Sequence, residues 1–331
     1  MNKWGKNIKL EIFGTSHGKE IGITIYNLPK NFALNMDAIR DDMNRRRPGY
    51  TIISTPRKEA DEFEILSGVE KNILNGEPLK MVIQNTNIKS SDYNSILRPG
   101  HADWTAFLKY GEVLPGGGQF SGRLTAPIVF AGAIAKQILN KKFNIIITSK
   151  ILSVGTQKNP TNEELEKIVL KTQEKSDSIG GVIQVRATNI PKALGSDFFG
   201  GIEALLSTLF FSIPAVKGVE FGDGFKLSES YGSMTNDAIY ADENKNIFSK
   251  TNHMGGILGG ISNGMDIVTN IAIKPTPSIS IEQDSINYKT FQPVKTKVTG
   301  RHDPCIVPRA LVVGEAMMAI GLLELTEEKN E

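Results

Sequence analysis

Histidines occupy four loop-like positions in this sequence, where each could donate or accept a proton near neutral pH. The chain has only four histidines. His17 lies in "GTSHG", His101 in "RPGHAD", His253 in "SKTNHMGG" and His302 in "GRHDPC". Glycine, proline, serine and charged residues surround them, and loops of this composition often carry catalytic groups. Asp303, next to His302, is a candidate general base.

Arginines near these histidines indicate an anionic ligand. Residues 45–47 are three consecutive arginines at the end of a predicted helix. Such a run has an ordinary explanation, because solvated cations complement the dipole of a helix C-terminus. Three adjacent side chains cannot all face one way on a helix, however, so at least one could point into a site. Single arginines also stand in loops rich in glycine, proline or serine, and they are more typical of converging ligands for carboxylate or phosphate groups: Arg57, Arg98, Arg123 and Arg301.

A glycine-rich segment, "PGGGQFSGRLT" at 115–125, precedes a predicted helix. Glycines allow the backbone to approach a ligand closely, and the following helix N-terminus favours an anion. The segment lacks the Gly-Lys-Ser/Thr ending of a phosphate-binding loop, and no GxGxxG with a downstream acid follows a strand, which disfavours a Rossmann site. Lys274 in "IKPTPSI" could hold a phosphate, although a solvated turn lysine explains it equally well.

A metal site is not expected. The sequence has no HxxxH or HExxH pattern, and its single cysteine, Cys305, cannot build a thiolate site. The residues alone therefore indicate an enzyme or a binding module for a small polyanion.

The composition is that of an ordinary globular protein. The chain has 331 residues, 40% of them hydrophobic, and a formal net charge of +2. A nearly neutral chain has no general affinity for nucleic acids. One cysteine excludes an intrachain disulfide, no apolar leader opens the sequence, and no apolar run reaches the roughly 20 residues of a membrane span. We expect a soluble cytoplasmic protein that binds neither nucleic acid nor membranes.

Hydrophobic spacing predicts interleaved strands and helices. Strands are predicted over 7–13, 21–27, 62–68, 79–86, 143–155, 181–188 and 265–273. One helix is predicted to begin after an N-cap at Asn35 and to stop at Pro48. Others are predicted over 124–139, 161–175 and 308–325, and one within 200–216 that ends near Pro214. The polar segment 87–123 is expected to hold few periodic elements and to carry function. We find no repeat and no linker, which favours one α/β or α+β domain over residues 1–331.

Several of these motifs together resemble the chorismate synthase family. In chain order they are "GTSHG", "RRRPG", "TPRKEADEFEILSG", "RPGHAD", "GGG..SGRLT", "SIPAVKGVEFGDGF", "GGILGGISNGMDI", "IKPTPSI" and "GRHDPCIVPRA". The resemblance covers about residues 7–324. It implies a single-domain β-α-β sandwich, usually assembled as a homotetramer. It also implies the last step of the shikimate pathway to aromatic amino acids: an anti-1,4-elimination of phosphate from 5-enolpyruvylshikimate 3-phosphate that gives chorismate. The reaction requires reduced FMN without net redox change.

The resemblance also implies roles for individual residues. By resemblance, His17 protonates the departing phosphate, His101 protonates the reduced flavin, and Asp303 works with the flavin in removing the ring proton. The substrate anions would meet four arginines: Arg47, Arg57, Arg98 and Arg301. The flavin would meet residues of three segments: Ser121, Gly122 and Arg123; Asn252 and His253; and Lys274, Pro275, Thr276, Pro277 and Ser278.

This sequence departs from the family pattern at some positions. Thr15 stands where the first motif usually has a glutamate, and Ile52 where many members carry a substrate arginine. The glycine-rich loop differs at residues 119, 120, 122 and 124. The chain is also short, whereas fungal members that reduce their own flavin tend to be longer. We therefore expect a monofunctional enzyme, supplied with reduced FMN by an external flavin reductase rather than reducing it with NADPH itself.

Two other functions are compatible with parts of the sequence. A non-catalytic flavin- or nucleotide-binding regulator with the same fold would be expected to lose His17, His101 or Asp303, and all three are present. A phosphotransferase would require a metal-binding pair of carboxylates near the glycine-rich loop, which residues 115–125 do not offer.

Overall fold

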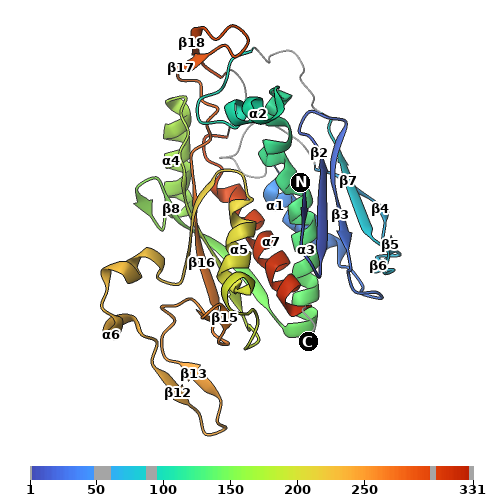
Figure 1. The fold of residues 1–331 in the computed structure, drawn as a ribbon, viewed down its shortest axis with the longest axis vertical. Helices are drawn as coiled ribbons and strands as arrows, with labels where there is room; N and C mark the ends of the chain where they lie inside the picture. Colours follow the sequence, from blue (N-terminus) through green and yellow to red (C-terminus); the bar gives the residue numbers. More distant parts are fainter. Residues whose placement is uncertain (1, 48–60, 87–94, 299–302, 328–331) are drawn as a thin grey trace.

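Two antiparallel sheets face each other across a layer of helices (Figure 1). The computed structural model describes residues 2–47, 61–86, 95–298 and 303–327. Helices between two sheets are the arrangement of a β-α-β sandwich, so the predicted fold is confirmed. Among the described residues, no helix combines the length and apolar character that crossing a bilayer requires.

The first sheet has the strand order β1-β2-β3-β7-β4. Its strands are β1 (Lys3–Trp4), β2 (Lys9–Gly14), β3 (Glu20–Tyr26), β4 (Phe63–Ser67) and β7 (Leu79–Gln84). The strands predicted over 7–13, 21–27, 62–68 and 79–86 are confirmed as β2, β3, β4 and β7. The turn between β2 and β3 carries His17.

The second sheet has the order β11-β16-β10-β8-β9. Its strands are β8 (Ile146–Val154), β9 (Gln157–Lys158), β10 (Gly181–Thr188), β11 (Val216–Phe221) and β16 (Ile267–Ile273). β16 alternates buried and half-buried residues along its whole length, because one face packs on the helices. The strands predicted at 143–155, 181–188 and 265–273 are confirmed, whereas β11 was not predicted.

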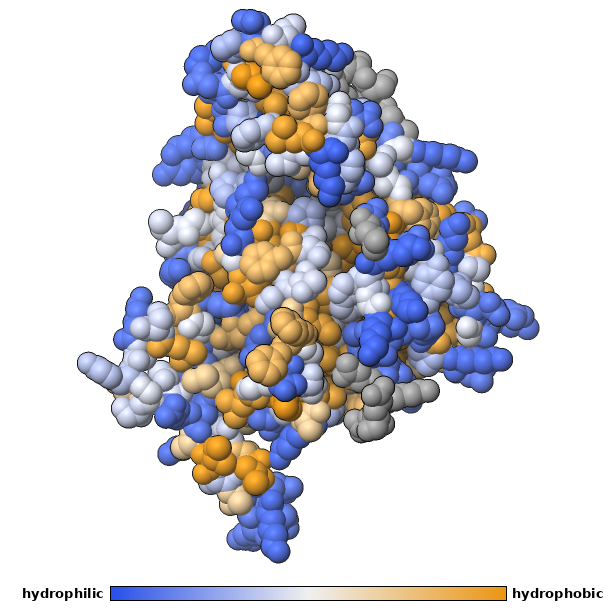
Figure 2. Space-filling view, viewed as in Figure 1, coloured by the Kyte–Doolittle hydropathy of each residue, from blue (hydrophilic) through white to orange (hydrophobic). Residues whose placement is uncertain are grey.

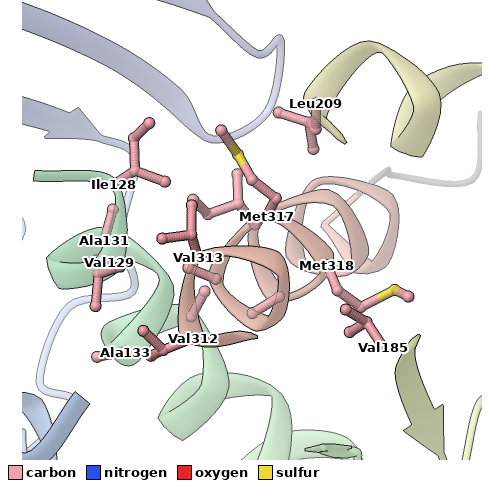
Figure 3. Close-up of a cluster of buried hydrophobic side chains, with 14 of the residues drawn as sticks. Ile128, Val129, Ala131, Ala133, Val185, Leu209, Val312, Val313, Met317 and Met318 are labelled. Carbon is pink, nitrogen blue, oxygen red and sulfur yellow. The ribbon is translucent and has the colours of Figure 1, made fainter. Parts of the chain in front are cut away.

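Four helices fill the space between the sheets: α1 (Met36–Arg46), α3 (Thr125–Phe143), α5 (Ile202–Phe211) and α7 (Val307–Thr326). α3 packs on β3 and β7, α7 packs on β8 and β10, and the two helices pack on each other. They approach closely because Gly132 faces Ala316; a β-carbon on Gly132 would lie 2.2 Å from the Ala316 Cβ. Figure 3 shows Val129 and Ala133 of α3 beside Val312 and Val313 of α7 in this core.

The predicted helix caps are present. The Asn35 side chain accepts hydrogen bonds of 3.1 Å from the backbone N–H groups of Asp37 and Ala38. Thr161 and Glu164 form a capping box at the start of α4 (Asn162–Glu174). These contacts satisfy backbone donors that a helix start leaves free, which is why both helices begin where the sequence indicated.

Within the described residues 95–123 of the polar segment, α2 (Asp103–Tyr110) is a helix that was not predicted. It begins inside "RPGHAD" and ends at Gly111, which has φ +75°. Trp104, Phe107 and Leu108 have the i, i+3, i+4 spacing of a helix, but α2 has only eight residues and stands between loops rich in glycine and proline. The helix was therefore overlooked within the polar segment. Two 3₁₀ helices follow, η1 (Pro115–Phe120) and η2 (Gly122–Leu124).

The smaller elements lie at the ends of the two sheets. They are β5 (Val69–Glu70), β6 (Ile73–Leu74), η3 (Phe198–Gly200), η4 (Gly224–Glu229), α6 (Gly232–Thr235), β12 (Ile239–Ala241), β13 (Ile247–Ser249), β14 (Ile257–Leu258), β15 (Ile261–Ser262), β17 (Gln283–Ile286) and β18 (Pro293–Thr296).

One buried carboxylate of α7 binds the segment between β1 and β2. Glu324 of α7 accepts hydrogen bonds from the backbone N–H groups of Lys6, Asn7 and Ile8, at 2.7 to 3.1 Å. The Asn7 side chain donates a further bond of 3.1 Å to the Glu324 carbonyl. A buried carboxylate is stable when several N–H groups share its charge, so the contact fixes the chain before β2 against α7.

Candidate functional site

Three consecutive glycines of η1 bring two candidate histidines to the same turn. Gly116, Gly117 and Gly118 have φ values of +62°, +84° and +52°, a region that side chains strongly disfavour. A β-carbon on Gly116 would lie 2.1 Å from His17 Nδ1, and one on Gly117 would lie 3.1 Å from His101 Nε2. All three glycines are therefore required by backbone conformation, and Gly116 and Gly117 also by the close approach of the two imidazoles.

His17 is held at the β2–β3 turn through its neighbour Ser16. The Ser16 hydroxyl lies 3.1 Å from His17 Nδ1, and the Ser16 backbone N–H donates to the Gly118 carbonyl at 3.2 Å. Ser16 is buried. The turn between the two strands is thus bonded directly to the glycine turn.

His101 lies in a cluster with Arg98 and Asp103, just before α2. Its Nδ1 is 2.6 Å from Asp103 Oδ1. Arg98 donates to both carboxylate oxygens, with Nε–Oδ2 at 2.7 Å and Nη2–Oδ1 at 2.8 Å. Burial raises the pKa of the Asp103 carboxyl, but hydrogen bonds from Arg98 and His101 lower that pKa more, and it ends well below the ordinary range. Asp103 is therefore ionised, and the Arg98 guanidinium is already engaged with it.

A small cavity of about 190 Å³ separates α2 from the glycine turn. Among the residues that line it are Asp103, Tyr110, Gly117 and Phe120. It gives the turn open space on the side of α2.

Of the three consecutive arginines, Arg46 is the one that turns inward. Its side chain is 2% exposed, and Nη2 lies 2.8 Å from Asp61 Oδ2. Arg123 binds the other oxygen of the same carboxylate, with Nη1–Oδ1 at 2.5 Å, and donates through Nε to Asn85 at 2.9 Å. Arg46 also donates to the Arg123 carbonyl at 3.2 Å. This buried network fixes the loop before α3, in which Ser121 and Gly122 precede Arg123.

The other two arginines of the triplet have different surroundings. Arg45 pairs with Glu315 of α7, with Nη2–Oε1 at 2.6 Å, and Lys136 contacts the same carboxylate at 2.5 Å. Arg47 is the C-cap of α1, where its backbone N–H bonds to the Met43 carbonyl. Arg45 therefore links α1 to α7 through Glu315. Arg47 follows the inward-facing Arg46 at the end of α1.

The "KPTPS" segment connects the end of β16 to the His101 loop. Lys274 donates through Nζ to the Gly100 carbonyl at 2.9 Å, and Arg98 Nη1 lies 3.4 Å from the Ser278 hydroxyl. A β-carbon on Gly100 would lie 3.5 Å from the Pro277 Cβ. Burial, and secondarily the charge of Lys217, lowers the pKa of the Lys274 ammonium. The segment and the histidine loop thus form one surface.

Asp303 reaches this same surface from the segment before α7. The Thr276 hydroxyl donates to the Asp303 carbonyl at 3.0 Å, which fixes its backbone beside the "KPTPS" segment. The Asp303 carboxylate pairs with Arg309 of α7, and Arg309 also donates to the Arg46 carbonyl at 2.9 Å. The candidate base is therefore bonded to the network that holds the arginines.

Asn252 and His253 lie elsewhere in the chain. The Asn252 side chain donates to the Asp266 carbonyl at 2.8 Å, just before β16 begins, whereas Lys274 follows the end of that strand. A strand of seven residues separates the two positions by about 20 Å. Asn252 lines a cavity of about 480 Å³ that also includes Asp223 and Asp266. One copy of the chain does not bring these two residues to the histidine site.

Two of the predicted substrate arginines, Arg57 and Arg301, lie outside the described residues, as do Ile52 and His302. In the described part of the chain, the site consists of residues from six segments. The sequence-predicted members that meet there are His17, His101, Arg98, Ser121, Gly122, Arg123, Lys274, Pro275, Thr276, Pro277, Ser278 and Asp303, with Arg47 at the end of α1.

Sequence reasoning missed the residues that hold the candidate groups in place. Asp61 and Asp103 are buried carboxylates, and Arg309 pairs with Asp303. Asp103 stands inside the "RPGHAD" motif, so a carboxylate two residues after a histidine was a signal that could have been used. Asp61 gave no comparable signal, because its two arginine partners are distant in sequence.

Comparison with known proteins identifies the family. The chorismate synthase family model matches residues 8–326. A chorismate synthase of Methanocaldococcus jannaschii is 43% identical over 98% of this chain and 96% of its own. One of Dehalococcoides mccartyi is 40% identical over 98% of this chain and 96% of its own. A chorismate synthase crystal structure superposes with a TM-score of 0.78 at 29% identity, covering 97% of this chain and 92% of that one. A match over nearly the whole chain, in both sequence and fold, means that this chain belongs to the chorismate synthase family.

Proposed function

We propose that the chain converts 5-enolpyruvylshikimate 3-phosphate to chorismate and phosphate, the chorismate synthase reaction of the shikimate pathway. The observation that carries the proposal is the position of His17 and His101 against adjacent glycines of one turn. Two imidazoles from different loops that meet at one glycine turn, beside arginines and a carboxylate, supply the acid, the base and the cations that eliminating a phosphate requires.

Each group has a chemical task in this proposal. His17 donates a proton to the departing phosphate, which leaves more easily as its charge is reduced. Asp303 accepts the proton that leaves the substrate ring, and its pairing with Arg309 holds it at the edge of the "KPTPS" segment. His101 supplies a proton to the reduced flavin. Arg47, Arg57, Arg98 and Arg301 are the proposed ligands for the substrate anions.

The cofactor of this family is reduced FMN, which supplies electron density to the substrate when it is bound. The residues present fit such a group. The glycine turn leaves no room for a β-carbon beside either histidine, and the cation Lys274 and the hydroxyl of Ser278 lie on the same loop surface. We propose that residues 121–123 and 274–278 hold the flavin.

A homo-oligomer, with a tetramer as the proposed state, explains two further features. Large apolar side chains are exposed beside α5, where Phe198 is 85% and Phe199 is 98% exposed. Figure 2 shows apolar side chains in this region and near the β12–β13 hairpin. Exposed apolar groups of this kind mark interaction surfaces. In such an assembly Asn252 and His253 would contribute to the flavin site only from a neighbouring copy.

One continuous apolar core includes both sheets and the helices between them, which supports a single domain over residues 1–331. We propose that an external reductase supplies the reduced FMN. We also propose a cytoplasmic location, which cell fractionation would test.

The direct test is release of phosphate from 5-enolpyruvylshikimate 3-phosphate without oxygen, with and without dithionite-reduced FMN. Release that requires reduced FMN, with an equal amount of chorismate, is the expected result. Release with NADPH and oxidised FMN alone would instead mean that the enzyme reduces its own flavin. No release under any condition, despite flavin binding, would contradict the proposed activity and favour a regulator.

A further inference from the structure

We propose that Asp103 is a positioning residue that fixes the tautomer of His101, with the proton on Nδ1 and the free lone pair on Nε2. The proposal deepens the role given to His101 above and rests on that proposed function. His101 Nδ1 and Asp103 Oδ1 are 2.6 Å apart, and the Asp103 side chain is 3% exposed.

The proton between these two atoms must belong to the imidazole. Asp103 is ionised and can only accept, because Arg98 binds both of its oxygens. Two acceptors 2.6 Å apart without a hydrogen between them would repel each other. Nδ1 is therefore the donor.

The opposite edge of the ring then faces the glycine turn. A β-carbon on Gly117 would lie 3.1 Å from His101 Nε2 and 2.9 Å from Cε1. With the proton fixed on Nδ1, Nε2 is the atom that takes up and returns a proton on the side of the turn. Only glycine leaves that edge accessible.

Arg98 makes the carboxylate necessary. Its Nη2 lies 3.0 Å from His101 Nδ1, and a guanidinium can only donate. If Asp103 lost its charge, Arg98 would be free to donate to Nδ1, which would then have to be the acceptor. The proton would move to Nε2, and the edge that faces the turn would change from acceptor to donor.

The chain contains a matched pair outside the site. His253 Nδ1 lies 2.6 Å from Asp223 Oδ2, but there the carboxylate side chain is 42% exposed. The same substitution at Asp223 thus changes an equal contact without touching the Arg98 cluster, and it serves as the spectroscopic control.

The test is solid-state ¹⁵N NMR of sedimented protein labelled at histidine, at about pH 9, where ordinary imidazoles are neutral. Only four histidines contribute, and a His101→Gln variant identifies the signal of His101. We expect a protonated Nδ1 in the unaltered chain and a protonated Nε2 in Asp103→Asn. Asp223→Asn should alter the His253 signal and leave that of His101 unchanged.

Activity supplies the second readout. Asp103→Asn should lower kcat about 100-fold, because the proton-carrying edge of His101 is altered. Asp103→Glu should restore part of kcat by returning the carboxylate.

Three results would overturn the proposal: a protonated Nε2 in the unaltered chain, an unchanged His101 signal in Asp103→Asn, or an altered signal with normal kcat. The first needs no variant, so it decides the matter even if Asp103→Asn does not fold. If the unaltered chain shows no turnover at all, the proposed function fails while the tautomer result still stands.

Discussion

Gly116 and His17 are in such close contact that a β-carbon on Gly116 would come within 2.0 Å of the imidazole Cε1. Gly116→Ala must therefore displace the ring of the proposed acid. We expect kcat for phosphate release to fall about 100-fold, because a displacement of about 1 Å has that effect on a positioned catalytic group.

Gly111→Ala is the matched control for this substitution. Gly111 also has a positive φ, +75° against +62° at Gly116, but a β-carbon there meets nothing within 4 Å. Gly111→Ala should lose about 1 kcal/mol of folding stability from the positive φ alone, and Gly116→Ala should lose more, because it must also displace the His17 ring. Only Gly116→Ala should lose activity. Equal activity in the two variants would mean that His17 is not the acid in the reaction.

Asp61→Asn should destabilise the protein strongly. Asp61 is buried and neutralises both Arg46 and Arg123, so its removal leaves two buried cations without their shared carboxylate. We expect the free energy of unfolding in urea to fall by about 3–5 kcal/mol. Asp37→Asn breaks an exposed ion pair with Arg40 at 2.9 Å and should change it by less than about 1 kcal/mol. Similar losses in the two variants would mean that the buried network adds no stability.

Glu315 makes the stability of the core depend on acid pH. Burial raises the pKa of Glu315, but the hydrogen bond from Arg45 and the charge of Lys136 lower it further, to about 2. A carboxyl with a depressed pKa contributes stability above its unfolded pKa, and that contribution is lost as pH falls through the folded value.

The difference in pKa predicts the loss of about 3 kcal/mol between about pH 4.5 and pH 2. Glu315→Gln should lack this part of the pH dependence in urea unfolding measured from about pH 6 down to about pH 2, while the exposed Glu243→Gln should retain it. The same acid-dependent loss in both variants would assign the effect to other carboxyls.

Lys274→Ala should weaken FMN binding by about 10- to 100-fold, because a charged hydrogen-bond donor at the proposed flavin surface is lost. Quenching of flavin fluorescence measures the affinity directly. Lys142→Ala is the control, since Lys142 pairs with Glu327 at the far end of α3. An unchanged affinity in Lys274→Ala would remove this lysine from the flavin site.

Much of the fold follows from local patterns in the sequence. α4 was predicted from Thr161 and Glu164 because a capping box acts within one turn. β10 was predicted over 181–188 because its apolar residues alternate across one buried face. α2 was not predicted because its eight residues stand between loops rich in glycine and proline. β11 was not predicted because a register shift between Val216 and Gly218 interrupts the alternation of its apolar residues.

The site was predicted only in part, and for a physical reason. His17, His101 and Lys274 stand in recognisable segments, and each lies where the fold brings those segments together. The partners of Asp61 are a helix residue and a loop residue that are 15 and 62 positions away, and no local pattern encodes such a pairing. Asn252 lies far from the histidines because it is bonded to the residue before β16, whereas the Lys274 segment, which contacts the His101 loop, follows the other end of that strand. No local pattern in the sequence shows this separation.

The bonds from Glu324 to the backbone of residues 6–8 have a consequence for how the protein is made. The segment between β1 and β2 leaves the ribosome long before residue 324 and cannot complete its contacts until then, because the carboxylate that binds it lies on α7. α7 also packs on β8 and β10 and on α3, so the helical layer on the second sheet is incomplete before then. Contacts that span almost the whole sequence slow folding and prolong the exposure of unpaired strands. Newly made chains of this protein should therefore depend on chaperones until synthesis has passed the last helix.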